Sequence, residues 1–390
     1  MEKKQKENVI KAYKGFDDKL QCIGFQYEVG KEYKMNGEIS CCRNGFHACQ
    51  SPLEVLDYYF LLNDGKMARF CEVEQAGTID KKDDGSTKVA SSKIKINREL
   101  TFSELISLGI EWLEKKVKYK KSKDSKLSDN GERHAKIVSG DNYVSILSNG
   151  NDAQIGSSGD KVQITNSGYF AKIGTNGNDV KIASSGYSAT IGSSGNGTTI
   201  GISGNDAKIG SSGNYAKIAS SGDNSKIGSS GDDAYIASSG GHANIGSSGA
   251  FAYIGSSGKH AKIGSSGDDA KIGSSGYSAQ IDSSGDDAYI ASSGHGTKIA
   301  SIGDCAKIGS SGNYTKIMSS GEDSVISCVG HNSIAQAKKG SWITLAEWVE
   351  DEKKNRWVPK CVKTEYVDGE RIKGDTWYEL IDGEFTEVDV

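Results

Sequence analysis

The chain has 390 residues and a formal net charge of −4, and it contains 50 Gly, 2 Pro and 35% hydrophobic residues. A chain built around one large conventional core carries more apolar residues and far less Gly, so that class is excluded for the chain as a whole. The near balance of charge argues against a general binder of polyanions.

The sequence carries no targeting or membrane-spanning signal. No secretory apolar region follows MEKKQKENVIKAYKGF, and no apolar run approaches the roughly 18 residues of a membrane span. The eight Cys are scattered without paired spacing, which is typical of reduced thiols in a cytosol. We therefore expect a cytoplasmic protein without membrane contact.

Residues 1–126 are predicted to form an α+β head domain. Strand patterns cover 9–16, 20–29, 68–75 and 88–96. Two helices are predicted, the first opening with the capping box Ser51-Pro52-Leu53-Glu54 and ending at Asn63-Asp64-Gly65. The second opens at Thr101-Phe102-Ser103-Glu104 and places four apolar residues on one helix face: Ile106, Ile110, Leu113 and Val117. A basic junction follows over 115–130.

The segment Gly45-Phe46-His47-Ala48-Cys49 is the candidate for chemistry in the head. Cys49 and His47 would suit a nucleophile pair, and a zinc site would draw on Cys22, Cys41, Cys42, Cys49 and His47. There is no C-x-x-C, and a buried Cys acting as a small hydrophobe is commoner than either site. We therefore assign no catalytic, cofactor-binding or metal-binding residue.

A nine-residue repeat fills the middle of the chain. Every ninth residue from Ile137 to Ile326 is Ile, which makes 22 consecutive repeats. A small residue lies two positions before each Ile and Ser usually lies two positions after, which is the spacing of one strand face. The intervening Ser-Ser-Gly-Asn/Asp supplies turn chemistry, with Gly free to take a positive φ and Asn or Asp able to bond its own backbone. Residues 127–339 are thus predicted to form a β-solenoid.

The tyrosines indicate how many repeats make one coil. Tyr235, Tyr253 and Tyr289 are 18 or 36 residues apart and share the position before Ile. A coil of two repeats places all three on one face, which gives 11 coils and a rod of about 50 Å at about 4.8 Å per strand.

The repeat raises three possible ligands for the solenoid: calcium ions, ice and nucleic acid. Calcium-binding nonapeptides need an Asp two positions before the Ile, where this chain has Ala, and the turn carboxylates recur irregularly. Ice binding needs a regular outward array, whereas the regular Ser points inward and is expected to form hydroxyl ladders. Nucleic acid would use the recurring Lys, but residues 131–335 hold 14 Lys and Arg against 17 Asp and Glu.

Two outward columns of the solenoid are candidate contact surfaces. The preferred partner-binding residues are Tyr235, Tyr253, Tyr289, Lys217 and Lys271, since aromatic side chains on a rigid scaffold are pre-organised anchors. The residue after Ile is Gly or Ala in most central repeats, and these small residues form a smooth strip. The strip is predicted to be an interface for a flat partner or for self-association, the latter through Gly246 and Gly264. The alternative is tight corner geometry that excludes large side chains.

Residues 340–390 are predicted to form a small β cap. Four of the five Trp lie there: Trp342, Trp348, Trp357 and Trp377. Asp368-Gly369 and Asp382-Gly383 are hairpin signals. The Trp residues either fill a compact core or anchor a partner, and the core is favoured.

Several motifs carry a resemblance that covers essentially the whole chain. AYKGF, GFQYEVGKEY, GFHAC, SPLEVLDYY and FCEVE resemble the N-terminal domain of an uncharacterised family of bacteriophages, prophages and gut bacteria. Its members continue into S-S-G-x-x-A-x-I repeats and end in a segment like GSWITLAEW…DGERIKGDTWYELIDGEF. The resemblance implies a phage or prophage protein in the host cytosol, where a host-defence protein would be a suitable target. It implies no activity.

A second similarity concerns the head alone. YKG at 13–15, GFHAC and FCEVE at 70–74 are similar in layout to ADP-ribosyltransferases. The similarity implies that Lys14 or His47 contacts nicotinamide dinucleotide and that Glu72 or Glu74 is catalytic. The chain departs from that superfamily in having Lys14 where Arg or His is usual and in lacking the central Ser-Thr-Ser.

We expect a non-enzymatic β-solenoid binding protein, without a cofactor, that holds a macromolecular partner on its side faces. A protein partner is favoured over nucleic acid. One alternative is an enzyme with an ADP-ribosyltransferase-like head and a solenoid targeting arm. The other is a self-assembling structural rod, which would be a homo-oligomer.

Overall fold

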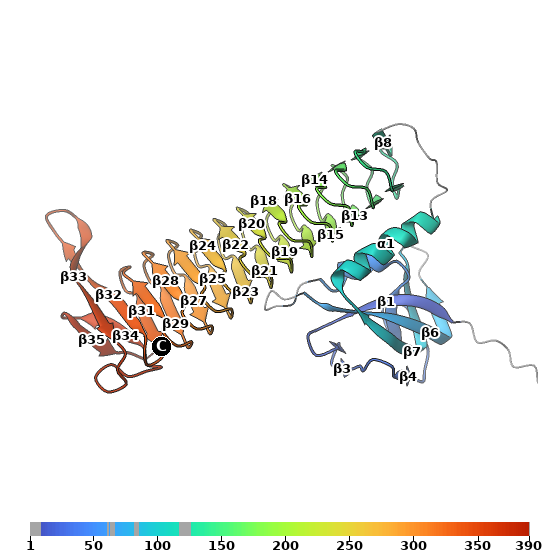
Figure 1. Cartoon of the computed structure of the whole chain (residues 1–390). Coiled ribbons are helices and arrows are strands. Elements are labelled where there is room, and N and C mark those ends of the chain that lie inside the picture. The colour runs from blue at the N-terminus through green and yellow to red at the C-terminus, as the bar shows by residue number, and fades with distance from the viewer. Residues whose placement is uncertain (1–8, 61, 63–66, 82–85, 117–125, 390) are drawn as a thin grey trace, which may run out of the picture. The chain divides into compact units, whose positions relative to one another are not determined.

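The computed structural model describes residues 9–60, 62, 67–81, 86–116 and 126–389 (Figure 1). The chain divides into two compact units, one of residues 1–199 with 207–213 and the other of residues 200–206 with 214–390. The boundary falls inside the solenoid. The predicted division at 126 and 339 therefore stays a prediction, although head, solenoid and cap are each distinct in fold.

A small antiparallel sheet forms the head, in the order β4-β7-β5-β1-β6. Its strands are β1 (Ile10–Phe16), β4 (Glu32–Lys34), β5 (Phe46–Cys49), β6 (Arg69–Lys81) and β7 (Lys88–Leu100). Because β7 also pairs with β6, four of these strands close into a ring. Inside it Phe16, Val73 and Ile94 are fully buried. The predicted strand over 20–29 is instead the two-residue pair β2 (Gln21–Cys22) and β3 (Phe25–Gln26), since Leu20 and Ile23 take positive φ.

The second predicted helix is confirmed as α1 (Phe102–Lys116). Its capping box forms, because Glu104 accepts a hydrogen bond from the Thr101 backbone N–H at 2.8 Å and returns one from its own N–H to Thr101 Oγ1. Ile106, Ile110 and Leu113 are buried as predicted. Val117 lies outside the described residues.

The first predicted helix is only a short 3₁₀ helix, η1 (Pro52–Asp57), and Ser51 makes no side-chain capping bond. The box fails because the Glu54 carboxylate accepts hydrogen bonds from Thr87 N and Oγ1, both at 2.7 Å. Glu54 thus fixes the loop before β7 instead of capping the helix. The predicted end at residues 63–65 lies outside the described residues.

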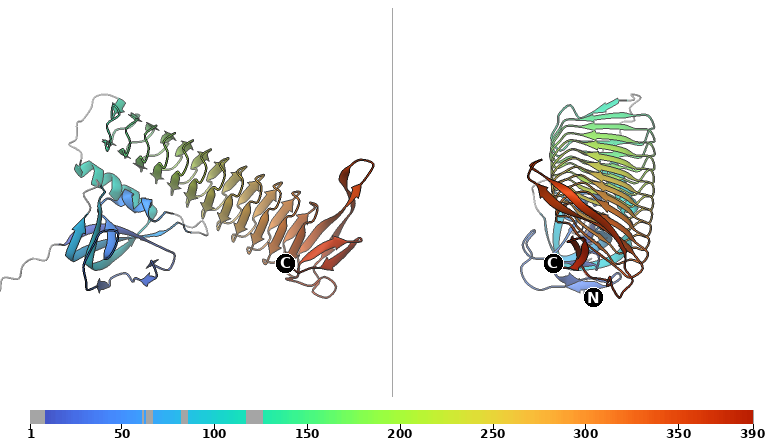
Figure 2. Two further views of the ribbon diagram at one scale, coloured as in Figure 1. Left: turned by 180° about the vertical axis from the view of Figure 1, so that it is seen from behind. Right: turned by 90° about the vertical axis from the view of Figure 1, so that its left-hand side faces the viewer.

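The solenoid is confirmed, with two strands in each coil of 18 residues (Figure 2). One sheet holds the even strands: β8 (Lys126–Ser128), β10 (Ser145–Ser148), β12 (Gln163–Asn166), β14 (Lys181–Ser184), β16 (Thr199–Ile202), β18 (Lys217–Ser220), β20 (Tyr235–Ser238), β22 (Tyr253–Ser256), β24 (Lys271–Ser274), β26 (Tyr289–Ser292), β28 (Lys307–Ser310) and β30 (Val325–Cys328). The other holds the odd strands: β9 (Lys136–Ser139), β11 (Gln154–Ser157), β13 (Lys172–Thr175), β15 (Thr190–Ser193), β17 (Lys208–Ser211), β19 (Lys226–Ser229), β21 (Asn244–Ser247), β23 (Lys262–Ser265), β25 (Gln280–Ser283), β27 (Lys298–Ser301), β29 (Lys316–Ser319) and β31 (Ile334–Ala337). These strands make about 12 coils rather than 11, because β8 and β31 extend the Ile repeat at its two ends.

Parallel pairing in register stacks identical residues and fills the solenoid core. Ile236 pairs with Ile254, and Ser238 pairs with Ser256. The Ile and the small residue two positions before it are both buried, as in Ile236 and Ala234. Each coil is too thin to bury apolar area alone, so its core is shared with its neighbours.

The turn glycines have a different role from the predicted one. Positive φ falls on the residue three positions before Ile, for example Asp233 and His242. The Gly five positions before Ile is needed for space instead, since an added Cβ would lie 1.8–2.1 Å from a carbonyl oxygen one coil earlier. The left-handed residue is held by the next coil: the N–H of His242 donates to the Lys259 carbonyl at 2.8 Å.

Turn Asn and Asp residues likewise connect coils rather than bonding their own backbone. Asp232 Oδ1 accepts a hydrogen bond from the Ala250 N–H at 3.0 Å, and Asp268 Oδ1 accepts one from the Asp286 N–H at 3.0 Å. An Asn or a deprotonated Asp serves equally well, which explains why the two alternate at this position.

The inward Ser residues do not form the expected continuous hydroxyl ladder. Where the next repeat has Ser or Thr five residues later the hydroxyls pair, as in Ser220 with Ser225 at 2.8 Å. Where that position is Ala, as after Ser238 and Ser256, the buried hydroxyl has no hydrogen-bond partner among the described residues. The expectation was wrong because 18-residue stacking alone does not bring one Ser into bonding geometry with the next.

Four strands close the C-terminal end: β32 (Trp342–Asp351), β33 (Arg356–Tyr366), β34 (Tyr378–Ile381) and β35 (Glu384–Glu387). β32 continues the even sheet in parallel, and then β33 and β34 add antiparallel strands, which ends the stacking on both sheets. Asp382-Gly383 forms the β34–β35 hairpin as predicted, whereas Asp368-Gly369 lies in the loop after β33. The prediction that the Trp residues of the cap fill a compact core is wrong for Trp342 and Trp357, because each is 48% exposed.

Candidate functional site

Six residues form a single outward column on the even sheet of the second unit. We call this the Tyr–Lys column, and from β18 to β28 it comprises Lys217, Tyr235, Tyr253, Lys271, Tyr289 and Lys307. All five residues predicted to bind a partner are in it. The structure brings them together because the coil length is twice the repeat.

Contacts along the Tyr–Lys column order its side chains. The rings of Tyr235 and Tyr253 stack with centroids 4.7 Å apart. Lys271 Nζ lies 4.7 Å from the centroid of the Tyr253 ring and donates to its hydroxyl at 2.9 Å, and this hydrogen bond raises the Lys271 pKa. Lys307 Nζ likewise lies 4.5 Å from the centroid of the Tyr289 ring. The three tyrosines are nevertheless 37–48% exposed, so part of each side chain is accessible to a partner.

The Tyr–Lys column continues into the cap. Val325 pairs in register with Lys307 and with Trp342, and Trp342 pairs with Tyr366 on β33. All three side chains are substantially exposed. The exposed Trp342 therefore extends the column.

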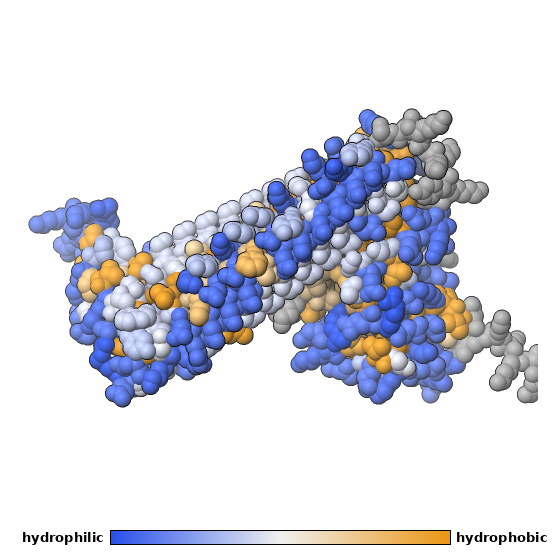
Figure 3. Space-filling model, viewed as in Figure 1, coloured by the Kyte–Doolittle hydropathy of each residue, from blue (hydrophilic) through white to orange (hydrophobic). Residues whose placement is uncertain are grey.

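An acidic corner borders the column, at the turns that precede the even strands. It carries nine carboxylates in the second unit: Asp232, Asp233, Asp268, Asp269, Asp286, Asp287, Asp304, Glu322 and Asp323. Two of them are ion-paired, Asp287 with Lys307 at 3.3 Å and Glu322 with Lys338 at 3.0 Å. Figure 3 shows a solenoid surface that is mostly pale or blue, with few orange residues.

The opposite corner holds an aromatic ladder that the sequence analysis missed. Successive rings lie 3.9–5.9 Å apart between centroids, all in the second unit: His242, His260, Tyr277, His295, Tyr314, His331 and Trp357. The ladder is recognisable from the 18-residue spacing when the residues three and four positions before Ile are aligned together.

The smooth glycine strip is occupied in the first unit. Helix α1 and η1 pack on the odd strands there, and an added Cβ at Gly192 would lie 2.2 Å from Ile106 Cδ1. At Gly210 it would lie 2.5 Å from Phe102 Cζ. Lys172 supports this contact through an ion pair with Asp57 at 3.1 Å. On these coils the strip is therefore covered by the head of the same chain. Gly246 and Gly264 lie on one such column, and their role in self-association stays a prediction.

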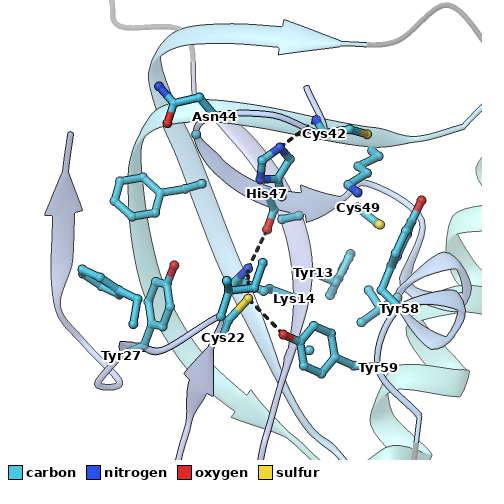
Figure 4. Close-up of a pocket in the computed structure, with 18 of the residues that line it drawn as sticks. Tyr13, Lys14, Cys22, Tyr27, Cys42, Asn44, His47, Cys49, Tyr58 and Tyr59 are labelled. Carbon is cyan, nitrogen blue, oxygen red and sulfur yellow. Dashed lines mark hydrogen bonds between the residues drawn. The ribbon is translucent and has the colours of Figure 1, made fainter. Parts of the chain in front are cut away.

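The head contains a pocket of about 430 Å³ between β1, β5 and η1 (Figure 4). Lys14 points into it from β1 and is 6% exposed. Its Nζ donates to the His47 carbonyl at 2.9 Å and to Cys22 Sγ at 3.3 Å. Tyr59 also donates to Cys22 Sγ, at 3.1 Å.

Burial governs the electrostatics of this pocket. It lowers the Lys14 pKa, and together with Lys88 and Lys14 it lowers the pKa of His47. His47 Nε2 accepts the Cys42 N–H at 2.8 Å, which suits a neutral imidazole. Burial also raises the Cys49 pKa to about 12, so this thiol is a poor nucleophile.

The transferase layout is not assembled around the pocket. Lys14 and His47 meet there, but neither Glu72 nor Glu74 is among its described lining residues. Glu72 opposes Tyr13 in register and therefore faces away from Lys14; it pairs with Lys11 at 3.0 Å. In the part of the chain that the structure describes, no three His, Cys, Asp or Glu side chains are grouped to hold a metal ion, and this includes the proposed zinc set.

In comparisons with known proteins, a match is found for the head alone. Residues 10–108 match a family described as a domain of unknown function, DUF7666. No curated protein and no solved structure matches the chain. Among the described residues no helix combines the length and apolar character needed to cross a bilayer. A β-solenoid joined to such a domain is consistent with a non-enzymatic binding or structural role.

Proposed function

We propose that the protein is a non-enzymatic binding protein whose solenoid holds a protein partner along the Tyr–Lys column. The observation that carries this is the stack of Tyr235 on Tyr253, exposed and fixed by the backbone register of β20 and β22. Side chains already ordered before binding lose little conformational entropy on contact. Tyr is also among the residues that dominate interface energies.

The balance of charge around the column supports a basic partner, since the bordering corner carries nine carboxylates and the column itself three Lys. Carboxylates beside exposed tyrosines suit a segment rich in Arg or Lys, since a guanidinium can stack on a tyrosine ring while it pairs with a carboxylate. The same charges oppose a nucleic acid phosphate backbone. A basic segment on a protein is therefore favoured. The resemblance to phage proteins adds a host-defence protein as a candidate.

Pull-down from a host lysate, with and without nuclease, tests the proposal. The test variant changes Tyr235, Tyr253 and Tyr289 to Ser. The matched control changes Tyr143, Tyr169 and Tyr187 to Ser; these are also exposed solenoid tyrosines and all lie in the first unit. A protein retained after nuclease by wild type and control, and lost by the test variant, would support the proposal. Equal retention by all three would contradict it.

A second variant tests the charge of the corner. Asp268→Asn and Asp286→Asn remove two charges but keep the Oδ1 acceptor that bonds the next coil. Asn already serves at this position at Asn313, whose Oδ1 accepts the His331 N–H. We expect the solenoid to remain folded and the captured protein to dissociate at lower salt than from wild type. An unchanged salt dependence would remove the acidic corner from the interface.

A further inference from the structure

The head pocket has an unusual balance of charge. Its described lining residues include three cationic side chains, Lys14, Lys88 and Arg43, and no Asp or Glu. Two nearby carboxylates are engaged elsewhere: Glu54 accepts hydrogen bonds from Thr87, and Asp57 pairs with Lys172. A pocket with this lining favours an anion.

Lys14 is buried in this pocket, and no described carboxylate pairs with it. Its Nζ donates to the His47 carbonyl and to Cys22 Sγ, and no described Asp or Glu carboxylate accepts a hydrogen bond from it. Burial of an amine costs free energy unless a partner offsets it, and the lowered Lys14 pKa reflects that cost. An incoming carboxylate or phosphate would provide the missing charge and shift the amine towards its protonated form.

The side chains of the pocket walls indicate which uncharged groups of a ligand would fit. Aromatic rings line the pocket on several sides: Tyr13, Phe25, Tyr27, Phe46, Tyr58 and Tyr59. Lys88 is held over the Tyr58 ring, with Nζ 4.2 Å from the centroid. A cavity of about 430 Å³ is in the size range of small-molecule sites. Flat apolar groups pack well against such rings.

From these features we infer that the head pocket binds a small organic anion with a flat apolar body, its carboxylate or phosphate at Lys14 and its body between the tyrosines (Figure 4). The site is separate from the Tyr–Lys column and does not depend on it. It gives the DUF7666 part of the chain a ligand class of its own.

Four small molecules that share a phenyl ring separate the effect of ligand charge from the effect of ligand shape. Calorimetric titration of the full chain with benzoate, phenyl phosphate, benzamide and benzamidine compares two anions, a neutral molecule and a cation on the same ring. We expect at least one anion to bind ten times more tightly than benzamide, and benzamidine not to bind. The better of the two anions identifies the head group as carboxylate or phosphate. Equal binding of all four probes, or of none, would overturn the inference.

Variants locate the binding within the pocket. Lys14→Met keeps the length of the side chain and removes the buried amine, so it should fold and should weaken the anion at least tenfold. Lys88→Gln, at a residue only half-buried, gives a second variant and should weaken it by a smaller factor. Tyr235→Ser, on the solenoid, should leave the affinity unchanged. Unchanged affinity in Lys14→Met, or inorganic phosphate binding as tightly as phenyl phosphate, would contradict the assignment.

Discussion

The rings of Tyr235 and Tyr253 lie within 3° of parallel, one coil apart. Parallel pairing in register holds their Cα atoms opposite each other, so the stack is a direct consequence of the 18-residue coil. Cross-strand aromatic pairs of this kind add to sheet stability as well as forming a surface.

Loss of either ring should therefore lower stability slightly. We expect a coupling of about 0.5–1 kcal/mol in a double-mutant cycle of Tyr235→Ser and Tyr253→Ser, measured by urea unfolding. Tyr235 and Tyr289 are further apart along the column and should show additive losses. A coupling of zero for the stacked pair would mean that the stack adds nothing beyond two independent side chains.

Two glycines three residues apart should differ sharply in their tolerance of Ala. At Gly258 the new Cβ would lie 1.9 Å from the Gly240 carbonyl oxygen, a backbone atom that cannot move aside. We expect Gly258→Ala to lower the free energy of unfolding by about 3 kcal/mol or more. At Gly255 no described atom lies within 4 Å of the added Cβ, so Gly255→Ala should change it by less than about 0.5 kcal/mol. Similar losses at both sites would refute the close-approach explanation.

The unpaired hydroxyls offer a route to a more stable solenoid. Ser256 Oγ is buried without a partner among the described residues, so Ser256→Ala should raise the free energy of unfolding by about 1 kcal/mol. Ser220 Oγ pairs with Ser225 Oγ, so Ser220→Ala should lower it by about 1 kcal/mol. Chemical denaturation measures both. Destabilisation by both variants would show that the Ser256 hydroxyl is satisfied in solution.

Docking of the head on the first coils should depend on the glycine strip. Gly192→Gln combined with Gly210→Gln inserts side chains where Ile106 and Phe102 pack. We expect faster hydrogen exchange and easier proteolysis in α1, since its packed face would lose contact. Gly201→Gln is the control, because no described atom lies within 4 Å of an added Cβ there. Unchanged exchange in α1 would mean that the strip does not hold the head.

Acid should loosen the first coil through Asp129. Burial tends to raise the pKa of this carboxyl, but hydrogen bonds from Ser148 Oγ and from the backbone N–H groups of Gly131, Asn149 and Gly150 outweigh it and hold the pKa below its ordinary value. The resulting stability is present above the unfolded pKa, near 4, and is lost as the pH falls through the lower folded pKa. The protection factors of the β8–β10 amides, corrected for the intrinsic pH dependence of exchange, should fall below about pH 4. Asp129→Asn should show the lowered protection already at pH 6; equal protection in both proteins at every pH would contradict this role.

Much of the fold followed from the sequence because a solenoid is periodic. The Ile column fixed the strands, and the spacing of Tyr235 and Tyr253 fixed the coil. The roles of Gly258 and Asp268 did not follow, because both act on the next coil, 18 residues away, rather than on their own turn. The failed capping box at Ser51 has a similar cause, since Thr87 competes for Glu54.

The candidate sites divide in the same way. The Tyr–Lys column could be predicted because its members share one position in the repeat. The aromatic ladder was missed because its members alternate between two turn positions, as His260 and Tyr277 do. The pocket required Lys14, His47 and Tyr59 to come together from β1, β5 and the segment after η1, and no local pattern predicts that.

Because each 18-residue coil contains two repeats, an odd and an even number of inserted repeats have different consequences for the surface. Insertion or deletion of a single nine-residue repeat between β22 and β26 would preserve every strand and turn. It would nevertheless move Tyr289 from the even to the odd sheet and exchange the acidic and aromatic corners beyond that point. Only changes of two repeats keep the faces continuous, so an evolving array of this kind can change its length freely by whole coils, while each half-coil step rearranges its surface.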